Sequence, residues 1–567
     1  MEPIDILGKM PEGLTLEEKK NEKTGETAYA LRSDREISVR DIVVGRFPFD
    51  YPKDAFLYAE GYQMLSQYTG TVETLECFTY LNDREHYRLR QTEGYKTVYN
   101  CLLVENAGFE SYDLYAFSSC FRFNGRILIN EREILLVLDL EGITVSAGQT
   151  LELEKVYVKK GGRRRKLFDT LACLLADNHK APVYRPLPTG WCSWYCFGRE
   201  VTGEKVTENL RVMKEKLPHL RYIQIDDGYQ KWVGDWLTSM ESYGDVRETI
   251  EKIHAEGFEP AIWVAPFAIS GESEIFKTHP EYCIRDENGD PLCSDRITYG
   301  GWTDGPWYMP DCTREDTREW MKNIFSVMRN EWGVKYFKLD ANVWGAIPGG
   351  VRSVRNSTSV DNYRLGMEAV CAGAGEDAVI LGCNAPIWPS IGAVNAMRVS
   401  GDMVRGEKTI RSLRREIFRR SWMHNILWTN DPDVLTVEAP GLAPQTLEYQ
   451  RCEIFASAGM LLIGDDMRSY RTEQFDLVKK FSPVFERAAE FEEDDRDLTC
   501  GHLSADGKDY YCLFWDDEEG TGEEKVFELA VGDRKAFDHW TDQPLAAENG
   551  VCRVPVLPHG GKVVRVE

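Results

Sequence analysis

The sequence lacks the features that mark several classes of protein. It contains no run of about 20 apolar residues, so we expect no membrane-spanning helix. The first residues, MEPIDILGKMPEGLTLEEKK, lack the basic start and apolar stretch of a signal peptide. The 9 histidines form no HxH or HExxH pattern, and no second cysteine pair stands at zinc spacing from Cys192 and Cys196. We therefore expect no metal, no other cofactor and no membrane partner.

Positive charge is outnumbered, with 68 Lys and Arg against 93 Asp and Glu. The formal net charge is −25, which makes nucleic acid and anionic membrane surfaces poor partners, whereas a neutral ligand such as a sugar is compatible with it. The 15 cysteines are an odd number and cannot all pair within the chain, so we expect most of them to be buried small side chains. These observations fit a protein of the reducing cytoplasm, and they leave open whether it forms a homo-oligomer.

The composition and the apolar pattern of the sequence change twice along the chain, and its length of 567 residues predicts several domains. Residues from about 25 to 160 are rich in β-branched and aromatic residues broken by turn formers, and the tail is similar. Between them, strand-like runs alternate with helix-like segments, as in a parallel sheet built from βαβ units. We therefore predict a multidomain chain, with an N-terminal β-sandwich at 1–160, a linker helix at 161–187, a central (β/α)₈ TIM barrel at 188–490 and a small C-terminal antiparallel β-sandwich at 491–567.

Eight strand candidates can be counted in the central region, which is the number of strands in the barrel. They lie at 190–195, 222–226, 260–266, 335–340, 378–383, 397–400, 426–429 and 460–463. A doubly wound sheet is the alternative, but it would favour a glycine-rich phosphate loop after the first strand, and PTGWCSWYCFGRE is not one. The longest insertion, about 269–311, follows the third strand, and we expect it to cover the mouth of the barrel.

Carboxylates follow most of these apolar runs. They are Asp226 and Asp227, Asp340, Asp402, Asp431 and Asp433, and Asp465 and Asp466. The residue just past a barrel strand points into the active-site mouth, so the pattern predicts an acid-lined cup. Such a cup suits glycoside hydrolysis, which uses two carboxyl groups. A helix N-cap is the alternative role for any single aspartate.

Two of these carboxylates have a basic residue close before them. Lys338 precedes Asp340 by two residues and therefore faces the same side of the strand. A cation there would keep a nucleophilic carboxylate ionised. Arg398 lies four residues before Asp402, and we expect it in the same cup.

Seven motifs then make the resemblance specific. GWCSWY, IQIDDGY, GDW, PAIWVAPF, KYFKLD, LGC and MRVSGD occur in this order, and together they resemble glycoside hydrolase family 36, in particular its α-galactosidases of melibiase type. The similarity covers about 185–470, and the plan of three parts agrees along the rest of the chain.

The resemblance implies a retaining exo-acting α-galactosidase on small oligosaccharides, with a role for each matching residue. Asp340 would be the nucleophile and Asp402 the acid/base. Asp226 and Asp227 would bind the O4 and O6 hydroxyls, Lys338 and Arg398 would hold ring hydroxyls, Trp263 would form the apolar wall, Trp194 and Tyr195 the rim, and Cys383 with Asn384 the O2 side. Asp431, Asp433, Asp465 and Asp466 are interpreted as turn and cap residues.

The sequence departs from the family pattern at three places around the pocket. Met64 and Leu65 follow Tyr62 and Gln63 where family members often carry a tryptophan, Asn384 and Ala385 follow LGC, and MVRGEK follows Asp402. These changes keep an α-N-acetylgalactosaminidase and an α-galactosyl transglycosylase open as alternatives. From other classes, a metal-dependent barrel enzyme and a catalytically silent sugar-binding protein remain alternatives.

Overall fold

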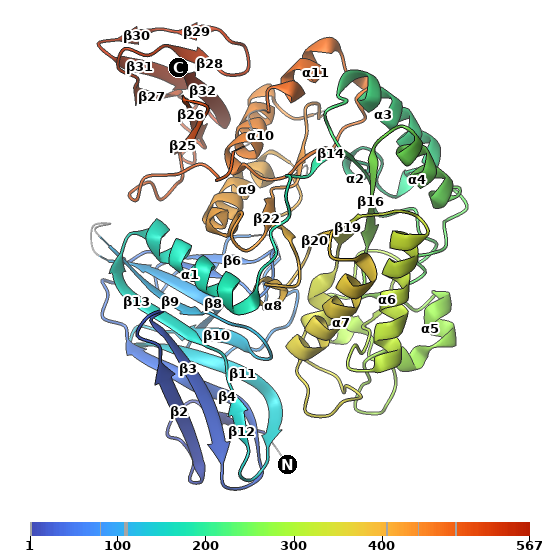
Figure 1. Cartoon of the computed structure of the whole chain (residues 1–567). Helices are drawn as coiled ribbons and strands as arrows, with labels where there is room; N and C mark the ends of the chain where they lie inside the picture. Colours follow the sequence, from blue (N-terminus) through green and yellow to red (C-terminus); the bar gives the residue numbers. More distant parts are fainter. Residues whose placement is uncertain (1–2, 80, 107–110, 404–405, 440, 482–484) are drawn as a thin grey trace. The chain divides into compact units, whose positions relative to one another are not determined.

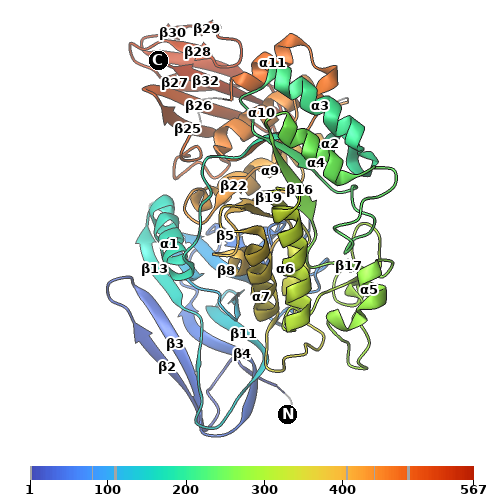
Figure 2. The same cartoon turned by 45° about the vertical axis from the view of Figure 1, so that its right-hand side comes forward.

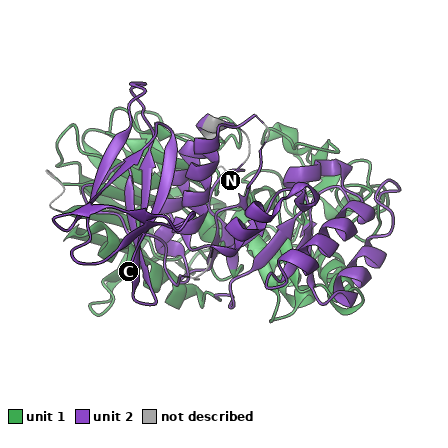
Figure 3. Cartoon of the chain, turned by 90° about the horizontal axis from the view of Figure 1, so that it is seen from above, with its two compact units in different colours: residues 1–182, 230–239, 264–395 green, residues 183–229, 240–263, 396–567 purple. Residues whose placement is uncertain are grey.

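The chain forms two compact units in the computed structural model, which describes residues 3–79, 81–106, 111–403, 406–439, 441–481 and 485–567. Unit 1 contains Met1–Pro182, Gln230–Ser239 and Val264–Asn395 (Figure 3). Unit 2 contains Val183–Tyr229, Met240–Trp263 and Ala396–Glu567. Both units therefore take part of the region predicted to be a barrel, and each is a discontinuous stretch of chain.

The N-terminal part of unit 1 is built from strands, as its composition predicted. Thirteen strands form one network in which β4, β11, β10, β8 and β9 are consecutive neighbours. They are β1 Ile4–Ile6, β2 Leu14–Lys20, β3 Glu26–Ser33, β4 Ile37–Pro48, β5 Leu57–Glu60, β6 Gln67–Gly70, β7 Glu76–Cys77, β8 Lys96–Glu105, β9 Tyr112–Phe117, β10 Asn124–Ile129, β11 Glu133–Val145, β12 Thr150–Glu152 and β13 Val156–Gly162. A core of Val, Ile, Leu and aromatic side chains such as Leu31, Val39, Leu102 and Leu136 lies within this network.

A helix follows the last of these strands, as predicted. It is α1, Arg164–His179, and its buried face includes Leu167, Leu171, Leu174 and Leu175, the residues whose spacing indicated it. In Figures 1 and 2, α1 lies along β13.

The central region alternates parallel strands with helices. In unit 2, β14 Thr189–Cys192 pairs in parallel with β15 Tyr222–Ile225 on one side and with β24 Leu461–Ile463 on the other. β15 in turn pairs with β16 Glu259–Val264, β24 pairs with β23 Val434–Leu435, and β21 Ala396–Arg398 pairs with β22 Thr429–Asp431. In unit 1, β19 Tyr336–Leu339 pairs in parallel with β20 Val379–Gly382. Continuous apolar runs of this kind are typical of buried parallel strands.

One predicted strand is displaced. The sequence predicted a strand at 426–429, but β22 begins only at Thr429. The backbone N–H groups of Ile426 and Leu427 both donate to the carbonyl of Met423, so residues 426 and 427 form a turn instead. The short strand β23 was not predicted, because two residues carry no recognisable pattern.

The helices of the central region come between these strands. They are α2 Trp194–Phe197, α3 Gly203–Lys216, α4 Val246–Ala255, α5 Glu274–Thr278, α6 Glu315–Asn330, α7 Ser359–Ala374, α8 Ile387–Ser390, α9 Glu407–Arg419, α10 Pro444–Ser457 and α11 Thr472–Lys479. Several begin at capping residues, and α7 has a capping box in which Thr358 and Asp361 satisfy each other's backbone N–H groups.

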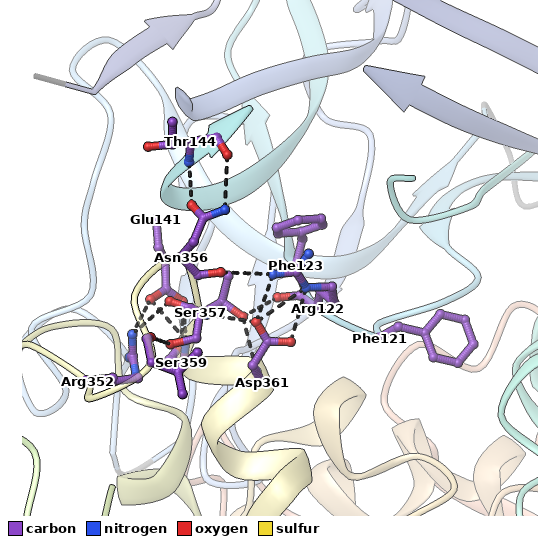
Figure 4. A network of polar contacts seen from close by, with 12 residues as sticks. Phe121, Arg122, Phe123, Glu141, Thr144, Arg352, Asn356, Ser357, Ser359 and Asp361 are labelled. Carbon is purple, nitrogen blue, oxygen red and sulfur yellow. Dashed lines mark hydrogen bonds and ion pairs between the residues drawn. The ribbon is translucent and has the colours of Figure 1, made fainter. Parts of the chain in front are cut away.

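A polar network joins the N-terminal strands to the start of α7 within unit 1 (Figure 4). Arg122 binds the carboxylate of Asp361, and the Asn356 side chain makes two hydrogen bonds with the backbone of Thr144. Glu141 accepts hydrogen bonds from the backbone N–H and the hydroxyl of Ser359, and burial raises the pKa of this carboxyl. The N-terminal strands therefore supply caps for a helix of the central region.

The C-terminal part of unit 2 consists of two antiparallel sheets with a shared core. The first contains β25 Cys500–Ala505, β26 Lys508–Trp515, β32 Gly560–Val566, β28 Ala536–Asp538 and β29 Pro544–Leu545; the second contains β27 Lys525–Ala530, β31 Val551–Val556 and β30 Ala547–Glu548. Leu513 and Val564 of the first sheet pack with Phe527 and Val554 of the second. Two packed antiparallel sheets are the arrangement predicted for this segment.

Two further observations concern the whole described chain. All 15 cysteines are free thiols, and nine of them are buried. Within the described residues, no helix is both long enough and apolar enough to cross a membrane.

Candidate active site

The predicted site residues fall into one group in each unit. Lys338, Asp340, Cys383 and Asn384 belong to unit 1. The seven others, Trp194, Tyr195, Asp226, Asp227, Trp263, Arg398 and Asp402, belong to unit 2. Within each group, the side chains stand at or just beyond the carboxyl ends of parallel strands, as predicted for most of them.

In unit 1, Asp340 stands directly after β19. Its backbone N–H donates to the carbonyl of Val264 at 2.8 Å, and one carboxylate oxygen accepts the N–H of Ala341 at 2.7 Å. Ala341 has a φ of +52°, a left-handed conformation that is uncommon for a residue other than glycine. Such backbone outliers cluster at functional sites, where the surrounding structure fixes them. Lys338, on β19, is buried, with 5% of its surface exposed.

The segment after Asp340 is held at two carbonyl groups. The Asn362 side chain on α7 donates to the carbonyl of Gly345 at 2.9 Å, and the hydroxyl of Tyr62 donates to the carbonyl of Ala346. Tyr62 lies in the loop between β5 and β6, so two different parts of unit 1 position the turn that follows the predicted nucleophile.

The segment after β20 contacts two loops of the N-terminal part of unit 1. The hydroxyl of Tyr87 donates to the side-chain oxygen of Asn384 at 2.9 Å, and the backbone N–H of Met64 donates to the carbonyl of Ala385 at 2.9 Å. Cys383, with 5% exposed, follows β20 and donates its N–H to Leu339 at the end of β19. Met64 therefore lies against Asn384, which links two of the three places where the sequence departs from the family pattern.

A buried carboxylate supports the loop that carries Tyr62 and Met64. Asp83 accepts hydrogen bonds from the backbone N–H of Tyr62 at 2.9 Å and from the hydroxyl of Ser66 at 2.7 Å. Burial raises the pKa of Asp83 to about 6, although these hydrogen bonds lower it. The sequence analysis did not identify Asp83 or Tyr87, because no local pattern signals contacts between distant segments.

In unit 2, Asp226 and Asp227 follow β15 and are each only 2% exposed. Asp226 accepts a hydrogen bond from the side chain of Gln224 at 2.7 Å, and its own N–H donates to the hydroxyl of Ser193 at 3.0 Å. The carboxylate of Asp227 lies 3.6 Å from the guanidinium of Arg199. Both carboxylates are thus fixed by polar neighbours, as groups that read hydroxyl positions would need to be.

Arg398 connects two carboxylates in unit 2. Its guanidinium lies 3.0 Å from Asp402 and 2.9 Å from Asp433, and only 1% of it is exposed. Asp433 also accepts the backbone N–H of Met403 at 2.7 Å and the hydroxyl of Tyr195. Burial, together with the charges of Asp402 and Asp433, raises the pKa of Tyr195 well above its usual value.

Asp433 therefore has more than the turn role that the sequence indicated. Its backbone does form a turn, with φ of +79° and its N–H donating to Asp431 at 2.9 Å. Its side chain, however, is the second partner of Arg398. The signal available in the sequence was the NDPD motif, which also recurs in the family that the chain resembles.

The other strand-end aspartates have structural contacts. Asp465 accepts the backbone N–H groups of Val437 and Glu438 and the hydroxyl of Tyr470, and burial raises its pKa to about 6. Asp466 caps the short helix Met467–Ser469 and pairs with Arg468. Their contacts are those of turn and cap residues, as predicted.

The predicted aromatic residues lie at the strands. Trp263 is on β16 and 1% exposed. Trp194 and Tyr195 are half-buried in α2 and pack against Cys192, Val434 and Leu462. Among the described residues, no group of three or more His, Cys, Asp or Glu side chains is arranged to hold a metal ion.

The central region is similar to domains of known glycosidases. Residues 187–427 match the model described as the glycosyl hydrolases family 31 TIM-barrel domain. A bifunctional alpha-galactosidase/sucrose kinase, AgaSK, of Mediterraneibacter gnavus is 23% identical over 227 residues, which are 38% of this chain and 23% of that protein. An A type blood alpha-D-galactosamine galactosaminidase of Flavonifractor plautii is 28% identical over 167 residues, 27% of this chain and 15% of that protein. The aligned parts thus span less than a quarter of either relative.

The fold similarity extends over nearly the whole chain. A crystal structure of a variant of the GH36 alpha-galactosidase AgaA from Geobacillus stearothermophilus, in complex with raffinose, has a TM-score of 0.65 and 12% identity, and the match covers 98% of this chain and 81% of that one. The central region is therefore similar to a glycoside hydrolase TIM-barrel domain over residues 187–427, and the fold of the chain is similar to that of a GH36 alpha-galactosidase. Its relatives and structural neighbours include α-galactosidases, as the motifs predicted, although the matching family model is numbered 31 and the motifs resemble family 36.

Proposed function

We propose that the protein is a retaining exo-α-galactosidase that removes terminal α-galactose from small oligosaccharides. One observation carries this proposal: each of the two carboxylates singled out by the motifs follows a parallel strand that contains a buried cation. Asp340 follows β19 with Lys338, 5% exposed, and Asp402 follows β21 with Arg398, 1% exposed. Lysine and arginine are almost never buried without partners, so these cations are part of a built polar site.

The two carboxylates would act in two steps. In the first, Asp340 attacks the anomeric carbon while Asp402 donates a proton to the leaving oxygen, which gives a covalent glycosyl-aspartate. In the second, Asp402 removes a proton from water, which attacks the anomeric carbon and releases Asp340. Asp402 would thus donate a proton in one step and accept one in the next. It pairs with Arg398, which also pairs with Asp433.

The remaining residues would hold the sugar. Asp226 and Asp227 would accept the O4 and O6 hydroxyls, because a carboxylate offers two acceptor oxygens to neighbouring hydroxyl groups. Lys338 and Arg398 would bind ring hydroxyls, Trp263 would form the apolar wall, Trp194 and Tyr195 the rim, and Cys383 with Asn384 the O2 side. The bound raffinose of the AgaA structure supports an α-galactoside oligosaccharide as the substrate class.

A second candidate is an α-N-acetylgalactosaminidase. It is favoured by Asn384 and Ala385 at the predicted O2 side. A relative from Flavonifractor plautii is named an alpha-D-galactosamine galactosaminidase, and galactosamine also carries a nitrogen substituent in place of the O2 hydroxyl. The two activities differ at one substituent of the sugar, so they can be distinguished directly.

The test is a panel of nitrophenyl α-glycosides that contains the galactoside, the N-acetylgalactosaminide and the glucoside. The proposal predicts the highest kcat/KM for the galactoside, with raffinose releasing galactose, and unchanged activity after treatment with a chelator. Preference for the N-acetylgalactosaminide would establish the second candidate. Binding of galactose without cleavage of any α-galactoside would contradict both.

A further inference from the structure

The insertion after the third strand presents an exposed tryptophan beside buried ones. It runs from β17, Ile269–Ser270, to β18, Trp307–Tyr308, which pair with each other and so bring its two ends together. Trp302 lies near the end of this insertion and is 40% exposed, whereas Trp307 and Trp344 are 1% and 0% exposed. The ring of Trp302 makes T-shaped contacts with both, at centroid distances of 4.7 and 5.8 Å.

The backbone on both sides of Trp302 is fixed by the buried indoles. The indole N–H of Trp344 donates to the carbonyl of Gly300 at 2.9 Å, and that of Trp307 donates to the carbonyl of Thr303 at 2.6 Å. Gly301 lies so close to Trp307 that a Cβ atom there would stand 2.5 Å from the ring, so a larger residue does not fit. An exposed ring on such a fixed backbone is preorganised for binding, because little chain entropy is lost when a ligand arrives.

This aromatic cluster is connected to the ends of β19 and β20 within unit 1. Trp344 stands four residues after Asp340, so their Cα atoms are at most about 15 Å apart. The ring of Tyr87 lies 5.8 Å from the ring of Trp344, and its hydroxyl binds Asn384. Trp302 is therefore two ring contacts, by way of Trp344, from Tyr87, whose hydroxyl binds Asn384 at the predicted O2 side of the sugar pocket.

An exposed indole such as that of Trp302 suits a sugar ring as a ligand. A pyranose has a face of C–H groups that packs on an aromatic ring, while its hydroxyls stay at the edge in water. A stable protein partner would instead need about 800 Å² of surface on each side, far more than one ring offers. The net charge of −25 also favours a neutral ligand.

We propose that Trp302 is a stacking platform for a sugar on the leaving-group side of an α-galactoside oligosaccharide. This inference rests on the proposed function and deepens it, since it assigns the protein to tri- and tetrasaccharides rather than to short galactosides. The ring adds binding to a part of the substrate that short galactosides lack, so its loss lowers kcat/KM for long substrates alone.

The experiment compares Trp302→Ala and Trp302→Phe with wild type on methyl α-galactoside, raffinose and stachyose. Phe121→Ala is the matched control, because Phe121 is another aromatic residue of unit 1 with 43% exposed, and it stacks on His179. We expect Trp302→Ala to lose about tenfold in kcat/KM on raffinose and stachyose, Trp302→Phe to retain most of it, and both to match wild type on methyl α-galactoside. Equal losses on all three substrates, or no loss on any, would overturn the platform.

A binding measurement separates this proposal from the proposed function. In the Asp340→Asn background, stachyose and galactose are titrated calorimetrically with Trp302 or with Trp302→Ala. Weaker stachyose binding with unchanged galactose binding supports the platform even if wild type cleaves no α-galactoside, in which case the proposed function alone fails. Unchanged stachyose binding contradicts the platform even if wild type is an active α-galactosidase.

Discussion

The two carboxylates that we propose to react are held in different ways by the two units. Asp340 in unit 1 makes hydrogen bonds with backbone groups: its N–H donates to the carbonyl of Val264, its side chain accepts the N–H of Ala341, and the turn after it is held by Asn362 and Tyr62. Asp402 in unit 2 lies at one end of a charge network, where Arg398 joins it to Asp433.

This difference matches two chemical tasks. A nucleophile must hold its position, and the backbone hydrogen bonds of Asp340 contribute to this. An acid/base must exchange a proton, and charged neighbours such as Arg398 and Asp433 affect how readily Asp402 would do so. The roles proposed for the two carboxylates therefore predict different responses to mutation.

Replacement of Asp340, the proposed nucleophile, should have the largest effect on activity. Asp340→Gly removes the nucleophile, so we expect kcat to fall by about 10⁴-fold or more on every α-galactoside, whatever its leaving group. Added azide should restore turnover and give a galactosyl azide of inverted configuration, measured by product analysis. Wild-type rates in this variant would show that the nucleophile is another residue.

The effect of replacing Asp402, the proposed acid/base, should depend on the leaving group of the substrate. Asp402→Ala removes proton donation, so we expect kcat/KM to fall by roughly 10²- to 10⁴-fold on raffinose. Aryl galactosides with acidic leaving groups need less help and should lose much less. If both kinds of substrate lose activity equally, Asp402 is not the acid.

The second partner of Arg398 offers a finer test. In Asp433→Asn one of the two carboxylates paired with Arg398 loses its charge and Tyr195 loses an ionised partner, so we expect kcat to fall by roughly 10- to 100-fold. The basic limb of the kcat/KM profile should also move to lower pH, because the loss of a nearby negative charge favours ionised Asp402.

A matched control distinguishes this effect from a loss of activity that would follow the replacement of any aspartate near a strand end. Asp466→Asn changes an aspartate that caps a short helix and pairs with Arg468, and we expect its pH profile to match that of wild type. A profile for Asp433→Asn that keeps the wild-type shape would remove Asp433 from the network.

The smallest expected effect concerns stability in unit 2. Glu416 accepts the N–H of Gly401, the residue before Asp402, and burial raises its pKa from 4.5 to about 7. A carboxyl with a raised pKa stabilises the folded state below pH 4.5, and this contribution, roughly 3 kcal/mol, is lost as the pH rises to about 7. Glu416→Gln should therefore flatten the fall in Tm between pH 5 and 8.

The control for this measurement is Glu528→Gln, which changes an exposed carboxylate paired with Arg553. We expect the pH dependence of its Tm to follow that of wild type. An unchanged slope in Glu416→Gln would mean that Glu416 is ionised in the folded protein across this range.

Strands and their terminal carboxylates could be predicted because they have local signals. Buried parallel strands have near-continuous apolar sequences, and Asp226, Asp340 and Asp402 stand at or soon after the ends of such runs. The strand at 426–429 was misplaced because the turn after Met423 consists of the same apolar residues as a strand.

Partners from distant segments could not be predicted in this way. Tyr87 and Asn384 are 297 residues apart, and Asp433 reaches Arg398 from the turn between β22 and β23. Such contacts depend on tertiary packing, which periodicity does not record. The resemblance to a family singled out the residues predicted to react, but their surroundings had to come from the structure.

The central claim is that Asp340 forms the covalent bond to the sugar. The most direct measurement is to trap that bond with a 2-deoxy-2-fluoro galactosyl fluoride, digest the protein and locate the label by mass spectrometry. The account predicts one labelled peptide, with the added sugar on Asp340 and no label in the Asp340→Gly variant. A label on Asp402 or any other residue would contradict it.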